Sequence, residues 1–225
     1  MHKRIMLGLT VTSLLALGLV APTAGATRFS ITSASFRSIT TSFTIFGTGA
    51  SGMIAATCDL TMMGTLHTTT WGKTANNLIG RMTRAYVNHP SCTEGDLWAL
   101  GDVEFLGGLE TIDSMPWHIQ YSTFAGALPA ITRVVLRVID ASFLVRTRTA
   151  FGQAVTCLYR STTTAPMILW VNLARSGEIT GLEQDFGNGI PVFSGGPNCP
   201  NPGFLSGQGT VTIPETTTRI FVRLI

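Results

Sequence analysis

The stretch at residues 117–124 reads Trp-His-Ile-Gln-Tyr-Ser-Thr-Phe, and its large apolar side chains fall at alternate positions. Trp117, Ile119 and Tyr121 therefore lie on one side of an extended chain, whereas His118 lies on the other. A period of two is typical of a β-strand that packs one face on a core. The stretch predicts such a strand, with His118 on its polar face.

The next stretch, residues 131–139, is apolar on both faces, as expected of a central strand. Residues 143–148 continue it, and the intervening Asp140-Ala141-Ser142 predicts a bend or a bulge. Many further segments of this kind alternate with turn sequences such as Arg175-Ser-Gly-Glu178. Short strands separated by turns favour a sandwich or a barrel. We predict an all-β fold, an antiparallel β-sandwich, with strands at 29–37, 39–46, 53–63, 65–71, 78–87, 97–106, 117–124, 131–139, 143–148, 153–160, 167–174, 178–182, 190–194, 209–213 and 220–225.

The first 26 residues have the three parts of a secretory signal peptide. Lys3 and Arg4 form a basic start, an apolar run follows from Ile5 to Val20, and small residues precede a cut after Ala26. The apolar run is shorter than the ~20 residues that a spanning helix needs, and no later stretch is long enough either. We therefore predict a leader at 1–26, a single β domain at 27–225 without a transmembrane helix, and export to the periplasm, the cell surface or the medium.

The four cysteines all lie in the predicted mature chain, and an even number in an exported protein indicates disulfides. Three pairings are open. Pairing between neighbours in the sequence suits hairpins and favours Cys58 with Cys92 and Cys157 with Cys199. The wide spacing and the lack of a Cys-x-x-Cys motif argue against a metal site.

The charge of the mature chain is close to neutral. The sequence has 15 Lys and Arg, and loss of the leader with Lys3 and Arg4 leaves 13 basic residues against 12 acidic ones. No basic stripe is present, which makes nucleic acid an unexpected partner.

No sequence motif for catalysis, for a metal or for a cofactor is recognisable. Gly-x-Ser-x-Gly, the P-loop and the EF-hand loop are all missing. The histidines His67, His89 and His118 have no metal-ligand partner at local spacing, and His89 is expected in a loop beside a disulfide. Two carboxylate pairs, Glu94 with Asp96 and Glu183 with Asp185, keep a glycosidase open. We predict no catalytic, metal or cofactor residues.

Exposed aromatic side chains are the remaining candidates for ligand contact. Of the four tryptophans, Trp71 precedes Gly-Lys-Thr in a polar stretch and is expected to be the most exposed. Trp71 and His118 are accordingly the candidate ligand-contact residues.

Two segments carry a resemblance to known proteins. They are Cys58-Asp-Leu-Thr-Met-Met-Gly-Thr65 and the unit that starts Met115-Pro-Trp and runs to Thr132. Over about residues 50–160 the chain resembles a family of small, uncharacterised secreted bacterial β-proteins. It is also distantly similar to the alkane oxidation activator family, in which Leu stands where this chain has Met115. The resemblance implies an exported β domain without an established enzymatic activity, and it transfers no catalytic residue.

Two functions follow as expectations. The first is a non-catalytic exported structural or binding protein that associates with itself through strand edges in the Thr-rich segments 28–46 and 216–225; pairing of both segments within their own domain is the alternative. The second is a secreted hydrolase of polysaccharide or peptide whose site gathers distant residues.

Overall fold

The computed structural model describes residues 28–50, 52–100, 115–128, 130–185 and 189–225. The predicted leader at 1–26 lies outside this range, as does most of the strand expected at 97–106. The described residues form 15 β-strands, and none of them belongs to a helix that could cross a membrane. The strands are β1 Arg28–Ile31, β2 Ser35–Gly49, β3 Gly52–Leu66, β4 Thr70–Gly72, β5 Leu78–Thr93, β6 Asp96–Ala99, β7 Trp117–Ala127, β8 Ala130–Ile139, β9 Ser142–Arg148, β10 Ala154–Arg160, β11 Met167–Leu173, β12 Ile179–Asp185, β13 Val192–Gly195, β14 Phe204–Thr212 and β15 Val222–Leu224.

The strands build antiparallel sheets that pack together, and the predicted all-β class is confirmed. The largest sheet runs β11-β12-β14-β2-β3-β5-β7-β8 and closes through the pairing of β8 with β11, so that it forms an eight-stranded barrel. Its inner face carries apolar side chains such as Val134 and Val171, which are direct partners across β8 and β11. The outer face carries residues such as Arg84 and Thr210. The alternation in each strand decides which side chains enter the lumen.

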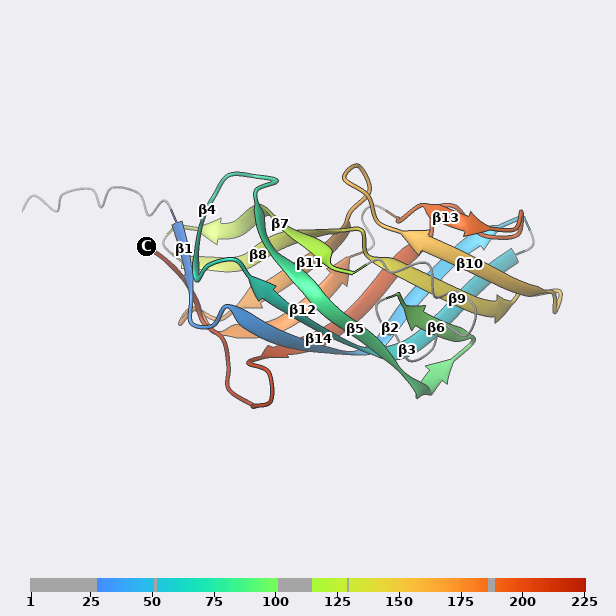
Figure 1. Ribbon diagram of the computed structural model, residues 1–225, viewed down its shortest axis with the longest axis horizontal. Helices are drawn as coiled ribbons and strands as arrows, with labels where there is room; N and C mark the ends of the chain where they lie inside the picture. Colours follow the sequence, from blue (N-terminus) through green and yellow to red (C-terminus); the bar gives the residue numbers. More distant parts are fainter. Residues whose placement is uncertain (1–27, 51, 101–114, 129, 186–188) are drawn as a thin grey trace, which may run out of the picture.

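A second sheet, β13-β10-β9-β6, packs against one half of the molecule (Figure 1). The long strands β2 and β3 reach beyond the barrel into this half. There Phe43 of β2 contacts Phe143 of β9 with 5.2 Å between ring centroids, and Phe143 also meets Trp117 edge-on at 5.3 Å. This half is the face-to-face packing that the sandwich prediction expects.

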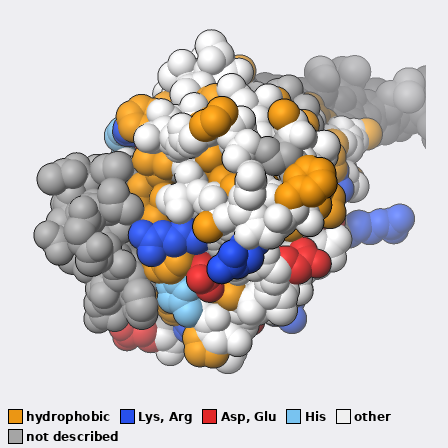
Figure 2. All heavy atoms as spheres, turned by 90° about the vertical axis from the view of Figure 1, so that its right-hand side faces the viewer, with side chains coloured by type: hydrophobic (Ala, Val, Ile, Leu, Met, Phe, Trp, Pro, Cys, Tyr) orange, Lys and Arg blue, Asp and Glu red, His pale blue; other side chains and the backbone are white. Residues whose placement is uncertain are grey.

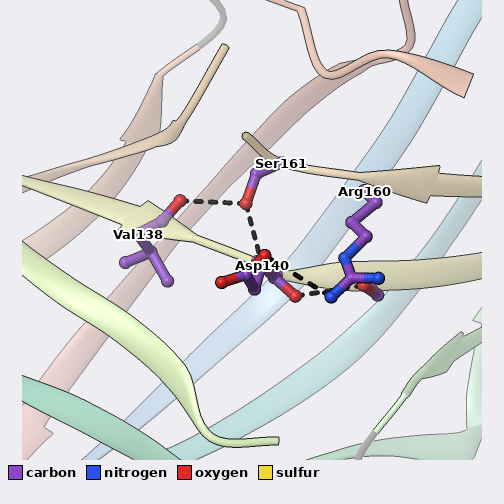
Figure 3. A network of polar contacts seen from close by, with 6 residues as sticks. Val138, Asp140, Arg160 and Ser161 are labelled. Atoms are coloured by element: carbon purple, nitrogen blue, oxygen red, sulfur yellow. Dashed lines mark hydrogen bonds and ion pairs between the residues drawn. The ribbon is translucent and has the colours of Figure 1, made fainter. Parts of the chain in front are cut away.

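The chain passes from the barrel to the second sheet between β8 and β9, at the bend that the sequence predicts (Figure 3). Asp140 adopts a positive φ of 67° there. The buried Ser161 hydroxyl donates to the Val138 carbonyl at 2.9 Å and accepts from the Ala141 N–H at 2.9 Å. The Arg160 guanidinium lies 3.4 Å from the Asp140 carboxylate. These contacts fix the direction in which β9 leaves the barrel.

Both predicted disulfides, Cys58–Cys92 and Cys157–Cys199, are present. They indicate an oxidising, exported environment. The second one ties the connection before β14 to β10. Beside it the buried Tyr159 hydroxyl donates to the Pro200 carbonyl at 3.1 Å.

The third sheet, β15-β1-β4, lies at the opposite end of the molecule and is called the cap here (Figure 1). In it Arg28 and Ile225 exchange two backbone hydrogen bonds, of 3.1 and 2.9 Å. The segments 28–46 and 216–225 thus pair within their own chain, which is the alternative to exchange between subunits.

Candidate binding site

The barrel holds an apolar cavity of about 60 Å³ at the end that the cap covers. Val134 and Val171 line it from the barrel wall, and Ile31, Trp71 and Val222 line it from the cap. Every wall strand alternates inward and outward, so the lumen receives the apolar half of each strand. No lining residue is an acid, a base or a cysteine, and the enclosed surface is apolar throughout.

An aromatic cluster attaches the cap to the barrel. Phe29 of β1 stacks on Trp71 of β4 and touches Tyr121 of β7, both with 5.5 Å between ring centroids. Phe124 meets the same ring edge-on at 6.1 Å, and the Lys73 ammonium lies 5.4 Å from the centre of Phe124. Burial raises the pKa of Tyr121 and so favours its neutral phenol. Such ring pairs stabilise by about 0.5–1.5 kcal/mol each beyond the area they bury.

The placement of Trp71 corrects one expectation. Its side chain is only 6% exposed, so the prediction that it is the most exposed tryptophan is wrong. The polar sequence around it is misleading, because β1 comes from the far N-terminal end of the described chain and covers the ring. Trp71 faces the lumen instead of solvent.

Trp71 is also unusual among the lining residues. Trp71 and Ser38 are the two lining residues whose side chains carry an N–H or O–H group. The Ser38 hydroxyl donates to the Met62 carbonyl at 3.5 Å. The Trp71 Nε1 is buried, and no described residue accepts its hydrogen.

A polar pair lies deeper in the barrel. Thr40 follows Ser38 by two positions on β2, and Gln184 follows Leu182 by two on β12, so both lie one step further along the same inner face. The Gln184 Nε2 donates to the Thr40 Oγ1 at 3.0 Å, while the Gln184 Oε1 has no partner among the described residues. Gly207 makes room for this amide, because a Cβ there would stand 2.5 Å from Oε1. The pair forms a polar floor inside the barrel and is not among the residues that line the cavity.

His118 lies on the outer wall of β7, as the alternation predicts, between partners Arg81 and Ile139. It is therefore on the opposite face of the barrel wall from the lumen. The structure does not bring His118 and Trp71 together. His89 is in β5, which continues to Thr93 where the sequence predicts a loop, so that expectation is wrong.

The two carboxylate pairs lie outside the lumen. Glu94 and Asp96 are exposed and line an open depression of about 400 Å³ beside Arg146 and Arg148. Glu183 accepts from the Asn172 amide at 2.9 Å on the outer barrel wall; the Asp185 side chain is outside the described part. Neither location encloses a substrate as a glycosidase site does.

The end of the molecule opposite the cap offers no single type of surface. Figure 2 shows hydrophobic, basic and acidic side chains mixed on this face. The most exposed large apolar residues include Phe151, at 78%, and Met53, at 62%. Among the described residues no group of three or more His, Cys, Asp or Glu side chains could hold a metal ion.

Comparisons with known proteins identify no relative of this chain. No family model matches the chain, and no curated protein and no solved structure is significantly similar to it. The resemblance drawn from the Cys58 and Met115 segments thus stays a prediction. The apolar cavity in the lumen, which the sequence did not indicate, is the candidate binding site that the geometry favours.

Proposed function

We propose that this chain is an exported, non-catalytic binding protein that encloses a slim apolar molecule, or the apolar end of a larger one, in its barrel. The observation that carries the proposal is the cavity of about 60 Å³ inside the barrel, whose surface is wholly apolar. Genuinely empty protein cavities are apolar, and one of ~150 Å³ can hold benzene or xenon. The volume here is smaller, so an entering chain requires lining side chains such as the flexible Met82 to move.

The chemistry of the lining supports binding over hydrolysis. A hydrolase needs a nucleophile or a general base beside the substrate, and such groups titrate. The lining offers none. Apolar surface that a ligand covers contributes roughly 25 cal/mol per Å².

Assembly through strand edges has weaker support. The edge strands of the cap and of the second sheet are β4, β15, β6 and β13. They are three or four residues long. Very short edges limit pairing between molecules. We therefore base the proposal on the lumen and not on the sheet edges.

The test is a titration of the mature protein, residues 27–225, with n-hexane, followed by methyl NMR of its valines. We expect saturable shifts at Val134 and Val171, which line the cavity, and none at Val135, which is on the outer face of β8. Equal shifts on both faces, or no saturable shift, contradict the proposal.

A further inference from the structure

An open depression lies beside the cap, where the turn between β11 and β12 meets β15. Its volume is about 370 Å³, and its described walls are residues 130–131 of β8, residues 174–177 of the turn and residues 222–224 of β15. Two of these wall residues, Arg175 and Arg223, carry a positive charge, and none carries a negative charge. Both arginines are exposed. The depression therefore offers two cations to a molecule that arrives from solvent.

Backbone contacts hold together the two elements that carry these arginines. The Val222 N–H donates to the Gly177 carbonyl at 2.7 Å, which attaches the turn to β15. Gly177 has a positive φ of 85°, and a Cβ there would stand 2.3 Å from the Val222 carbonyl oxygen and 3.5 Å from the Arg223 Cγ. Glycine is the residue that permits such a close approach. Because Arg175 lies two residues before Gly177 and Arg223 directly follows Val222, the fold fixes the two positions relative to each other.

Neither arginine is neutralised by a described residue. The acid nearest to Arg175 in the sequence, Glu178, already lies 3.0 Å from the Arg219 guanidinium. The ion pairs of the described chain include neither Arg175 nor Arg223. The planar guanidinium presents its N–H donors in a fork that matches the oxygens of a carboxylate or a phosphate. An anion of this kind is therefore the ligand that the depression suits.

The depression and the apolar cavity adjoin each other, because Val222 lines both. No described residue that lines the cavity carries a charge, so an ionic group inside it would be buried without a partner, which is strongly unfavourable. A molecule that uses both spaces thus keeps its charged end in the depression and its apolar end in the lumen. Val222 belongs to β15 of the cap, a strand of three residues without a cysteine, and is the wall that must move to admit the apolar end.

We propose that the ligand of the lumen is a single-chain amphiphile with an anionic head group, a carboxylate or a phosphate, and that Arg175 and Arg223 bind this head group in the depression. The inference rests on the proposed function, because the apolar chain needs the lumen. Binding of either end makes binding of the other end an intramolecular event. An anionic amphiphile is therefore held more tightly than a neutral one of the same length.

The experiment compares sodium octanoate with octan-1-ol, which has the same number of carbons and no charge, by methyl NMR of the valines of the mature protein. We expect both ligands to shift Val134 and Val171, which line the cavity. In low salt octanoate should bind about fivefold more tightly than octan-1-ol. Most of this difference should disappear in about 0.5 M NaCl, because salt screens exposed charges. Sodium acetate, which has the carboxylate without the chain, should shift neither valine.

Two substitutions test the arginines. Arg175→Gln and Arg223→Gln each remove one exposed charge and keep a polar side chain of moderate length. Each should weaken octanoate binding about twofold to fivefold and leave the affinity for octan-1-ol unchanged. Arg84→Gln is the matched control, because Arg84 is also exposed but lies on the outer wall of β5 over the Tyr86 ring. It should change neither affinity.

Should either variant fail to fold, the comparison of the two ligands at low and high salt on the unmodified protein decides the matter by itself. Equal affinity for octanoate and octan-1-ol at both salt concentrations overturns this inference. Octanoate binding that shifts neither Val134 nor Val171 also overturns it, since the depression then binds a free anion only. In both cases n-hexane that still shifts these valines leaves the proposed function standing. If n-hexane, octan-1-ol and octanoate all leave the two valines unshifted, both proposals fail.

Discussion

Filling the lumen should raise stability and abolish binding together. Val134 on β8 and Val211 on β14 both line the cavity and are not on neighbouring strands, so Val134→Ile with Val211→Ile adds two methylene groups from different sides. At roughly 24 cal/mol per Å³, a void of about 60 Å³ represents about 1.4 kcal/mol. Two buried methylenes contribute ~1.6 kcal/mol before packing strain. We expect the free energy of unfolding to rise by about 1 kcal/mol.

Urea unfolding followed by far-UV circular dichroism measures this change, and the n-hexane titration measures the loss of binding. Val135→Ile is the control, because it makes the same substitution on the outer face of the same strand. It should alter neither quantity. A double variant that loses more than about 1 kcal/mol would show a lumen already filled to normal density. A stabilised variant that still binds n-hexane would show that the ligand site is elsewhere.

Three further predictions test the surroundings of the lumen. Gly207→Ala should lower the free energy of unfolding by about 1–3 kcal/mol, because its Cβ would stand 2.5 Å from the buried amide oxygen of the floor; Gly196→Ala, which meets nothing within 4 Å, should be nearly neutral in the same urea titration. Burial raises the pKa of Tyr159 from 10.0 to about 12. The contribution of its neutral phenol to the free energy of unfolding is therefore complete below pH 10 and is lost between pH 10 and 12, by at most ~2.7 kcal/mol and less after solvent screening. Alkaline unfolding curves that coincide for Tyr159→Phe and the unmodified protein would contradict this. Removing the second disulfide by Cys157→Ala with Cys199→Ala should cost about 3–4 kcal/mol, given its sequence separation of 42; thermal unfolding within a few degrees of the parent would show that the loop it closes is already ordered without it.

Local patterns in the sequence correctly predicted the features of the fold that depend on residues close together in the chain. The alternation at residues 117–124 placed Trp117 inside and His118 outside, and β7 has that arrangement. The bend at Asp140 was predicted because a short polar break separates two apolar runs, and the chain turns there. The neighbouring-pair disulfides were favoured because hairpins bring nearby segments together, and both are present.

The features that the sequence did not predict depend on pairing between strands that are far apart in the chain. The barrel closes because β8 pairs with β11, and nothing in either strand alone specifies that partner. The lumen was missed for the same reason, since it exists only after closure. Trp71 was expected in solvent from its Gly and Lys neighbours, but β1 covers it, and β1 is placed by β15 at the other end of the chain. A signal was available in the sequence, because β1 and β15 are short segments at the two ends of the described chain and have no nearby hairpin partner.

The two ends of the barrel are held by different means, and this bears on how a ligand enters. Cys157 belongs to the four-stranded sheet, and Cys58 pairs on β3 with Phe43, whose ring packs on that sheet, so both disulfides stabilise the same half. The cap has no disulfide in its strands, each of which is three or four residues long, and the barrel retains it through the Phe29 ring contacts and a few backbone hydrogen bonds. Local opening costs least where few contacts must break. The cap is thus the wall of the lumen that can open while the disulfide-bonded half stays folded.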